Sequence, residues 1–385
     1  MSLRARRVTT MAVATAALML STSACGSSDS DEKALAWVGP LTGESANLGK
    51  NSLNGAKVAI DEANKNGGPK IKLLSFDSQG DPAQATTIKD RYIHDSNVIG
   101  VVGPTFSGET KAILPDLQSN GLVMVSPSAT NVALPTIVAN ETVFHRIMAD
   151  DDAQGKALAG YLTKVLKAKK IAYIHDNSDY GRGLAEGTQK LTEAAGAKTV
   201  LTDVIEPKGQ DYSSAVNKVK AAAPDVVMYG GYYTDAGHLR KQLVDGGVKV
   251  PFLGGDGSFD PGFIEAGGTN ANDATISCPC NLATTESAGA LGDFARNYKA
   301  LNGSDPGTYS TEGYDAAKIL IKGIQEGHDT RPSLLDYVEH VAPQDGLSKK
   351  IAFEDNGNVK STAIFFFTVK NGKFTLVGNS EDLLK

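Results

Sequence analysis

"VVGPTFSGET", residues 101–110, runs from an apolar strand through a glycine turn into the start of a helix. Its serine, Ser107, lies where the strand and the helix meet. A serine in this place can act as a nucleophile, cap the helix, or help the helix N-terminus to bind an anion. The rest of the chain has to decide between these three interpretations.

The same pattern of strand, turn and helix recurs along the chain. Predicted helices carry apolar residues at helical spacing, such as Leu53, Ala56 and Ile60. The alternation restarts near residue 150, and 385 residues exceed what one hydrophobic core usually spans. We therefore predict an α/β protein with two Rossmann-like lobes, each built on a parallel central sheet. Near the C-terminus, Asn371-Gly372 predicts a hairpin turn.

The N-terminal segment is predicted to direct secretion and to carry a lipid. Three arginines precede the short apolar run at 11–20, so residues 1–24 are interpreted as a signal peptide. Cys25 follows small residues and precedes a Gly/Ser/Asp tract, which resembles a bacterial lipobox. Residues 25–33 would then be a lipidated cysteine and a flexible tether. Ordinary signal-peptidase cleavage nearby is the alternative.

Charge and cysteine usage narrow the possible functions. Loss of residues 1–24 removes three of the 38 basic residues and none of the 44 acidic ones, which leaves a net charge of −9. Such a balance argues against nucleic-acid binding. Cys278 and Cys280 can form a disulfide or remain free thiols, and both alternatives stay open. The six histidines show no metal-ligand spacing, so we predict neither a metal site nor a cofactor.

Catalysis finds little support in the sequence. Ser107 would need a general base, and the nearest histidine at a strand end, His175, belongs to the other predicted lobe. The stretch is not G-x-S-x-G, and no P-loop or dinucleotide fingerprint occurs. We therefore predict that the chain is not an enzyme.

Binding of a zwitterion explains the polar loops better. Ser107 and Thr130 offer hydroxyl donors at two successive strand ends of the first lobe. In the second lobe, Asp256 lies within "GGDG", and Tyr180 and Tyr232 follow other strands. This pairing suits a carboxylate on one side and an ammonium on the other. The alternatives are a helix cap for the hydroxyls, a turn residue for the aspartate, and tyrosines that cover core edges.

Several loops together resemble one known family. "VGPLTG", "VVGPTFSGET", "VSPSATN", "IAYIHDNSDYGRGLAEG", "YGGYYTDAG" and "FLGGDG" are similar to the leucine/isoleucine/valine-binding proteins, which serve ATP-driven (ABC) importers. The resemblance covers nearly all of residues 34–370 and implies the type I periplasmic-binding fold, with three crossovers near residues 147, 278 and 355. It also implies lobe boundaries, with lobe 1 at 34–147 plus 279–355 and lobe 2 at 148–278 plus 356–385.

The resemblance also implies roles for individual residues. The ligand carboxylate would contact Ser107 and Thr130, and backbone atoms of Ser128 would contact both ends of the amino-acid group. Tyr180 and Tyr232 would line the opposite wall. Asp256 would accept the ammonium, although the leucine/isoleucine/valine binders carry glutamate there.

Three further positions depart from the family pattern. Leu48 stands where the family has an aromatic residue that closes the side-chain pocket. Gly80 and Phe106 replace the cysteines of the family's lobe-one disulfide, so Phe106 is expected to shape the pocket wall. Branched-chain preference is therefore an expectation from the family, not from this pocket.

These observations lead to one functional hypothesis. We expect a monomeric lipoprotein on the outer face of the cytoplasmic membrane, attached by its lipid alone. It would capture an L-amino acid, with branched-chain ligands favoured, by hinge closure and deliver it to the permease of an ABC importer. The alternatives are a same-fold binder of an amide, a short peptide or an aromatic acid, or a sensor ectodomain.

Overall fold

A computed structural model describes residues 32–140, 142–347 and 349–385. The predicted signal peptide and the predicted lipidation site, Cys25, lie outside the described residues. Both therefore stay predictions.

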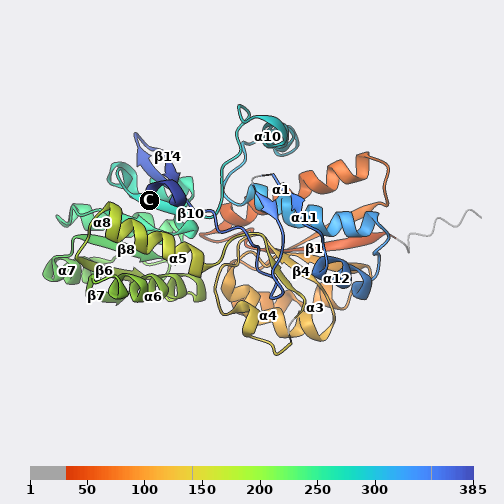
Figure 1. Ribbon diagram of the computed structural model, residues 1–385, viewed down its shortest axis with the longest axis horizontal. Helices are drawn as coiled ribbons and strands as arrows, with labels where there is room; N and C mark the ends of the chain where they lie inside the picture. Colours follow the sequence, from red (N-terminus) through yellow and green to blue (C-terminus); the bar gives the residue numbers. More distant parts are fainter. Residues whose placement is uncertain (1–31, 141, 348) are drawn as a thin grey trace, which may run out of the picture. The chain divides into compact units, whose positions relative to one another are not determined.

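The first lobe is built on five parallel strands in the order β2-β1-β3-β4-β5 (Figure 1). Strand β3 is buried along its whole length, as expected for a sheet with helices on both faces. The five strands are β1 (Lys33–Gly39), β2 (Ile71–Asp77), β3 (Val98–Val102), β4 (Met124–Ser126) and β5 (Phe144–Arg146).

The second lobe repeats this order and extends it. Its sheet runs β7-β6-β8-β9-β10, the same order as in the first sheet. An antiparallel hairpin, β13-β14, then extends it beside β10. Asn371 and Gly372 have φ angles of +50° and +71°, so the predicted hairpin turn is confirmed. The strands are β6 (Lys170–His175), β7 (Lys198–Val204), β8 (Val226–Gly230), β9 (Phe252–Gly254), β10 (Thr275–Cys278), β13 (Phe365–Lys370) and β14 (Lys373–Asn379).

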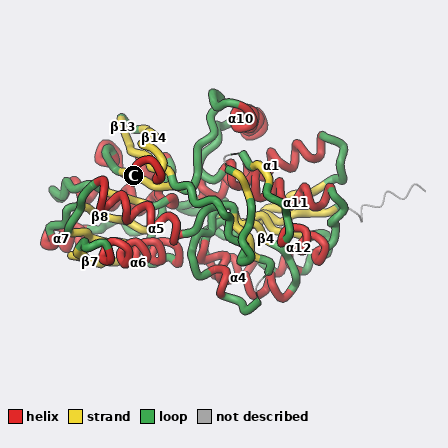
Figure 2. Tube along the Cα trace, in the orientation of Figure 1, coloured by secondary structure: helices red, strands yellow, loops and turns green. Residues whose placement is uncertain are grey.

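Helices cover both sheets (Figure 2). Those of the first lobe are α1 (Ala46–Lys65), α2 (Pro82–Ile88), α3 (Asp90–Ile93), α4 (Ser107–Ser119), α10 (Gly289–Asn302), α11 (Ser310–Gln325) and α12 (Arg331–Glu339), joined by a small ladder of β11 (Gln344–Asp345) and β12 (Lys350–Ile351). Those of the second lobe are α5 (Asp151–Gly160), α6 (Asp179–Ala194), α7 (Ser213–Ala222), α8 (Tyr233–Asp245), α9 (Pro261–Gly267) and α13 (Ser380–Leu383). Three short 3₁₀ helices, at Leu134–Thr136, Asp256–Ser258 and Gly268–Ala271, and a π-helical segment at Tyr161–Val165 complete the described helices.

The chain passes between the lobes three times. It leaves the first sheet after β5, returns after β10 to form helices α10 to α12, and enters the second sheet again at β13. Helix α11 packs on α1 and on strands β3 and β4 of the first sheet, although it follows the second sheet in sequence (Figure 1). The predicted fold class is confirmed, whereas the boundary residues of the lobes remain predictions.

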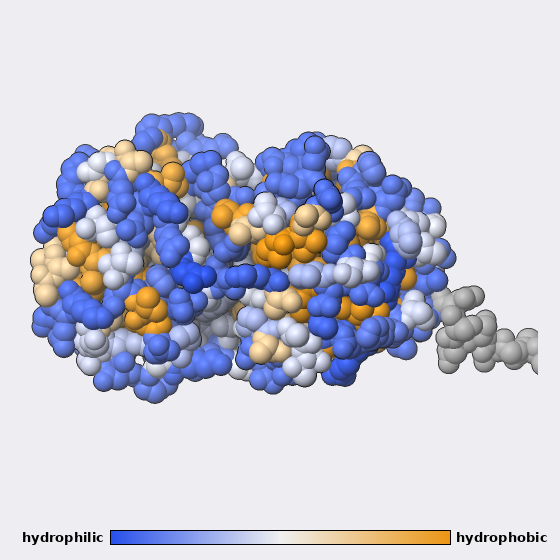
Figure 3. Space-filling model, turned by 90° about the horizontal axis from the view of Figure 1, so that it is seen from below, coloured by the Kyte–Doolittle hydropathy of each residue, from blue (hydrophilic) through white to orange (hydrophobic). Residues whose placement is uncertain are grey.

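The visible surface is largely hydrophilic, with separate apolar patches on both lobes (Figure 3). Most large apolar side chains lie instead in the cores on either side of the two sheets. Among the described residues, no helix combines the length and apolar character that a membrane crossing requires.

Candidate functional site

The predicted ligand residues lie at the carboxyl ends of parallel strands. Ser107 begins the helix after β3, Tyr180 follows β6, Tyr232 follows β8, and Asp256 follows β9. In both sheets the strand order reverses beside the first strand, β1 or β6, and such reversals are where open α/β sheets bind ligands. The topology therefore brings the loops chosen from the sequence to one place.

Asp256 is the centre of the second-lobe wall. Its side chain is 1% exposed, and its two oxygens accept hydrogen bonds from Tyr180 (2.8 Å) and Tyr309 (2.6 Å). Burial raises the pKa of Asp256, and the hydroxyl groups of Tyr309 and Tyr180 counter part of that rise. The carboxylate is thus held by neutral donors, and no cationic side chain of the described residues forms an ion pair with it.

The glycines around Asp256 make room for Tyr180. A Cβ atom on Gly255 would lie 2.5 Å from the Tyr180 hydroxyl oxygen, and one on Gly257 would lie 2.7 Å from its ring. The Gly257 N–H also donates to that hydroxyl (3.0 Å). The motif "GGDG" therefore does more than form a turn, because it allows a tyrosine to reach the aspartate.

A second buried carboxylate, Asp151, lies near Asp256. It is the first residue of α5 and is 4% exposed, and neither of its oxygens has a hydrogen-bond partner. Burial, and then the charge of Asp256, raise the pKa of Asp151 well above its usual range. The side-chain oxygens of Thr130 and Gln154, both fully buried, are unpartnered as well.

These unpartnered atoms indicate which ligand groups the site would bind. Buried polar groups normally find partners, so several unsatisfied oxygens in one place favour a ligand rich in N–H donors. Gln154 uses its amide nitrogen on Ser277 (3.2 Å), which leaves its oxygen for another donor. A primary ammonium, with three N–H groups and a positive charge, matches the oxygens of Asp151 and Gln154.

The first-lobe wall carries hydroxyl groups that are partly used within the protein. Phe106, not Ser107, occupies the N-cap position of α4, and the Ser107 hydroxyl accepts a hydrogen bond from the Asn131 N–H (3.1 Å). The interpretation of Ser107 as a helix cap is therefore wrong. Its own proton remains able to donate to a ligand. The Ser128 hydroxyl donates to the Thr105 carbonyl (2.7 Å), so it fastens the loop after β4 to the loop after β3.

An aromatic row connects the two walls. The rings of Phe106 and Tyr232 lie 4.4 Å apart, and the rings of Tyr232 and Tyr180 lie 5.4 Å apart. Leu48 is fully buried in the same apolar cluster as Phe106, and Tyr232 packs against that cluster. Phe106 and Leu48, two of the departures from the family pattern, therefore belong to the same apolar cluster.

The two lobes touch each other around this site. Lys111 forms an ion pair with Asp179 (2.7 Å). Asn47 donates to Asp260 (3.1 Å), and Tyr309 reaches Asp256 from the start of α11. The structure is thus closed over the predicted ligand residues, which explains why seven of the eight are at most 5% exposed.

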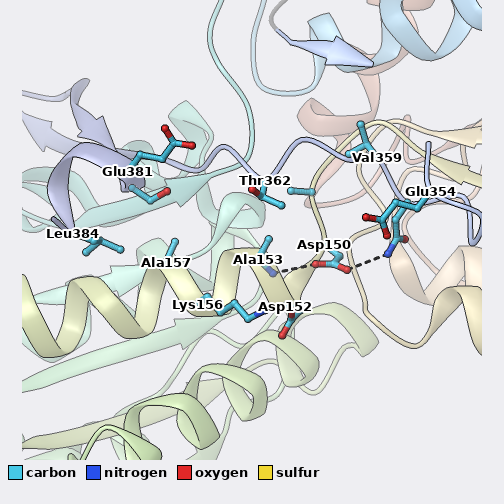
Figure 4. A pocket seen from close by; sticks show the side chains of 13 residues that line it. Asp150, Asp152, Ala153, Lys156, Ala157, Glu354, Val359, Thr362, Glu381 and Leu384 are labelled. Carbon is cyan, nitrogen blue, oxygen red and sulfur yellow. Dashed lines mark hydrogen bonds and ion pairs between the residues drawn. The ribbon is translucent and has the colours of Figure 1, made fainter. Parts of the chain in front are cut away.

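An open cavity lies elsewhere, beside the crossovers. It measures about 490 Å³ and is lined by α5, by the segment before β13 and by the C-terminal helix (Figure 4). Its lining includes four acidic residues and one lysine: Asp150, Asp152, Glu354, Glu381 and Lys156. Lys156 forms an ion pair with Asp152 (2.6 Å). It contains none of the eight predicted ligand residues. The interlobe cluster is therefore the candidate ligand site, because buried unpartnered oxygens favour binding more than open surface space does.

The two remaining cysteines lie in the second crossover. Cys278 and Cys280 are joined as a disulfide, with Cα atoms 5.0 Å apart. Within the described part of the chain, no group of three or more histidine, cysteine, aspartate or glutamate side chains is arranged to hold a metal ion.

Sequence reasoning missed three residues of this site: Asp151, Gln154 and Tyr309. Asp151 stands in the run Asp150–Asp152, where acidic residues at a helix start are common and carry no signal of their own. Tyr309 has a φ of +71°, which is rare for a tyrosine and marks a residue held by its surroundings. A tyrosine directly before a helix, where it cannot cap, was the only available signal.

Residues 34–373 match the family described as periplasmic binding protein. The chain belongs to this family. It is 31% identical over 341 residues to the Leu/Ile/Val-binding protein homolog 3 of Brucella melitensis, covering 87% of this chain and 91% of that protein. It is 27% identical to the leucine-, isoleucine-, valine-, threonine- and alanine-binding protein of Pseudomonas aeruginosa, covering 92% and 93%. The family resemblance stated from the sequence is confirmed.

Solved structures agree with the fold. The branched-chain amino acid transporter substrate binding protein LivJ from Streptococcus pneumoniae, in complex with isoleucine, superposes with a TM-score of 0.80 at 25% identity. That match covers 90% of this chain and 99% of the other. The type I periplasmic-binding architecture is therefore established for this chain.

Proposed function

We propose that this protein is the extracytoplasmic substrate-binding lipoprotein of an ABC importer and captures an L-amino acid between its lobes. Leucine, isoleucine and valine are the favoured ligands, because relatives spanning most of the chain are named for them. Hinge closure would enclose the ligand. The function is reversible capture, not catalysis.

One observation carries the proposal: two buried carboxylates, Asp151 and Asp256, are close enough to raise the pKa of Asp151, and neither forms an ion pair with a cationic side chain of the described residues. A ligand ammonium would supply the missing charge and the missing donors. The ligand carboxylate would then meet the hydroxyl group of Ser107 at the start of α4, where the helix dipole favours an anion, and that of Thr130 in the loop after β4.

The ligand side chain would lie against Phe106 and Tyr232 of the aromatic row and against Leu48. These side chains offer apolar surface, which suits an aliphatic side chain. Asp256 is one methylene shorter than glutamate, so the ammonium would sit closer to the second lobe or reach it through a water.

The experiment is calorimetry with three matched compounds. Leucine carries both charged groups, 4-methylpentanoate lacks the ammonium, and isoamylamine lacks the carboxylate. We expect binding of leucine and at least a 100-fold loss for each analogue, because each leaves buried polar groups unpaired. Equal affinity for 4-methylpentanoate and leucine would contradict the role of the carboxylates.

Membrane attachment is tested separately. Cys25→Ser should release the protein from the membrane fraction while ligand affinity stays unchanged, because the site lies far along the chain from the tether. Retention in the membrane fraction would argue against the lipid anchor. We further propose a monomer that docks on its permease, which light scattering of the purified protein can test.

One observation favours a second ligand class. The contact between Phe106 and Tyr232 narrows the wall and presents two aromatic faces, which also suits an aromatic acid or a small amide. A thermal-shift screen over amino acids, amides and aromatic acids separates the two hypotheses, because a bound ligand raises the melting temperature.

A further inference from the structure

One arginine connects the loop that carries Thr130 (residues 129–131, the ligand loop) with the first and third crossovers between the lobes (the hinge). Arg146 is the last residue of β5, and its side chain is fully buried. Its Nε donates to the Asn358 side chain (2.9 Å), and one terminal nitrogen donates to the carbonyl oxygens of Ala129 (3.1 Å) and Asn131 (2.8 Å). The other terminal nitrogen reaches the Asp150 carboxylate (3.4 Å).

The two carbonyl groups flank Thr130, whose hydroxyl is predicted to bind the ligand. The carbonyl of Thr130 itself accepts a hydrogen bond from the backbone of Asp151 (2.9 Å). Residues 129–131 are therefore fixed on one side by the guanidinium and on the other by the residue that carries the unpartnered carboxylate. A shift of Arg146 would move both ligand contacts together.

The same guanidinium holds two of the three crossovers. Asn358 belongs to the third crossover, and its amide also donates to Asp150 of the first (3.3 Å). The backbone N–H of Arg146 donates to Gly357 (3.0 Å). Asp150 in turn caps α5 by accepting from Ala153 (3.0 Å), as the dashed line in Figure 4 marks. The hinge and the ligand loop thus share one buried cation.

We infer that Arg146 is a positioning residue for ligand capture, which keeps Thr130 and Asp151 in register with the first and third crossovers. This inference rests on the proposed function. A planar guanidinium suits the task because it donates in several fixed directions at once, which an ammonium group cannot do.

The charge of Arg146 has a second consequence for Asp151. Burial and Asp256 raise the pKa of Asp151, and the Thr130 hydroxyl and then the positive charge of Arg146 lower it again. The other ionisable groups that interact with Asp151 are Asp150, Tyr180 and Tyr232. Loss of Arg146 should therefore keep Asp151 protonated to higher pH, where it binds an ammonium poorly.

The chain offers a matched control in Arg240. Its side chain is 7% exposed and donates to three backbone carbonyls, those of Val250, Asn270 and Asn272. It lies in α8, and none of these partners belongs to a crossover or to the ligand loop. Substitution of either arginine removes a buried cation with carbonyl partners, but only one substitution touches the hinge.

The experiment compares Arg146→Met with Arg240→Met. For Arg146→Met we expect leucine affinity to fall at least tenfold and the midpoint of its pH dependence to rise, with faster deuterium exchange across residues 127–133. For Arg240→Met we expect a similar loss of melting temperature and leucine affinity within threefold of wild type. Arg146→Lys should restore the pH midpoint, because the charge returns, but not the full affinity.

Each outcome decides the matter. If both methionine variants lose affinity equally, or Arg146→Met binds as wild type does, the positioning role is wrong. If Arg146→Met does not fold, Asn358→Ala replaces it, and a loss of affinity below threefold there contradicts the inference. If wild type binds none of the amino acids, the proposed function fails. Exchange across residues 127–133 then still tests whether Arg146 holds the loop, and unchanged exchange overturns that role.

Discussion

The two walls of the candidate site use different chemistry. The first-lobe wall presents neutral hydroxyl groups, and those of Ser107 and Ser128 already have partners within the protein. The second-lobe wall presents the buried carboxylates of Asp256 and Asp151, with no cation paired to them among the described residues. A lost hydroxyl can be replaced in part by water, whereas a lost buried charge leaves its partner without compensation. We therefore expect the second-lobe wall to contribute more to affinity.

Asp256→Asn, in the second-lobe wall, should cause the largest loss of ligand affinity. The amide keeps the shape but removes the charge, so we expect leucine affinity to fall about 100-fold, or roughly 3 kcal/mol. The melting temperature of the free protein should stay equal or rise, since burial raises the pKa of Asp256 and its charge destabilises the fold. Calorimetry and thermal denaturation measure the two quantities. A variant that binds within threefold of wild type would remove Asp256 from the site.

Thr130→Val tests the opposite wall with a smaller expected effect. The substitution keeps the volume and removes a hydroxyl that interacts only with the Asp151 carboxylate, so the pKa of Asp151 should rise further while stability changes little. We expect about a tenfold loss of leucine affinity, which corresponds to one hydrogen bond to a charged group. Thr192→Val is the matched control, because this buried hydroxyl donates to Gln189 (2.9 Å) in α6. It should lower the melting temperature and leave affinity unchanged, and the reverse pattern would contradict our assignment.

The affinity for leucine should also depend on pH. An ammonium binds an ionised carboxylate, and the pKa values of Asp151 and Asp256 are both raised by burial. Leucine affinity should therefore fall as pH drops through these values, by up to about tenfold per pH unit for one proton. Titrations between pH 5 and 8 in buffers of different ionisation enthalpy should detect proton release on binding. Constant affinity over this range would mean that both carboxylates stay ionised.

The stability of the free protein should fall as pH rises, whereas its affinity for leucine should increase. Burial raises the pKa of Glu109 to about 7 from an ordinary value of 4.5. Its stabilising contribution is present below 4.5 and lost as pH rises through 7, worth about 3 kcal/mol in full. The pKa of Asp315 is likewise raised by burial to about 7, so the free protein should melt at lower temperature at pH 8 than at pH 5.5. Glu109→Gln should weaken that trend, and an undiminished trend would contradict the assignment.

The fold was predictable because its signals are local. Apolar runs, helical spacing and the Asn371-Gly372 turn each depend on neighbours in sequence, and their alternation indicates the sheets. The ligand site depends on which loops meet, and there the sequence was informative only where a motif marked the residue, as "GGDG" marks Asp256. Asp151 could not be distinguished from Asp150 and Asp152, because helix starts favour acidic residues whatever their function.

Phe106→Ala should produce the smallest change in leucine affinity, only a few-fold, because the ring is expected to line the side-chain wall and not to contact the charged groups of the ligand. Its larger effect should be on selectivity. Removal of the ring opens space beside Tyr232 and Leu48, so affinity for phenylalanine relative to valine should increase about tenfold, within the range of 1–3 kcal/mol that pocket shape provides. The fold should lose about 3 kcal/mol, since Phe106 is 5% exposed in an apolar cluster. Competition calorimetry with both amino acids measures the ratio, and an unchanged ratio would place the ligand side chain away from Phe106.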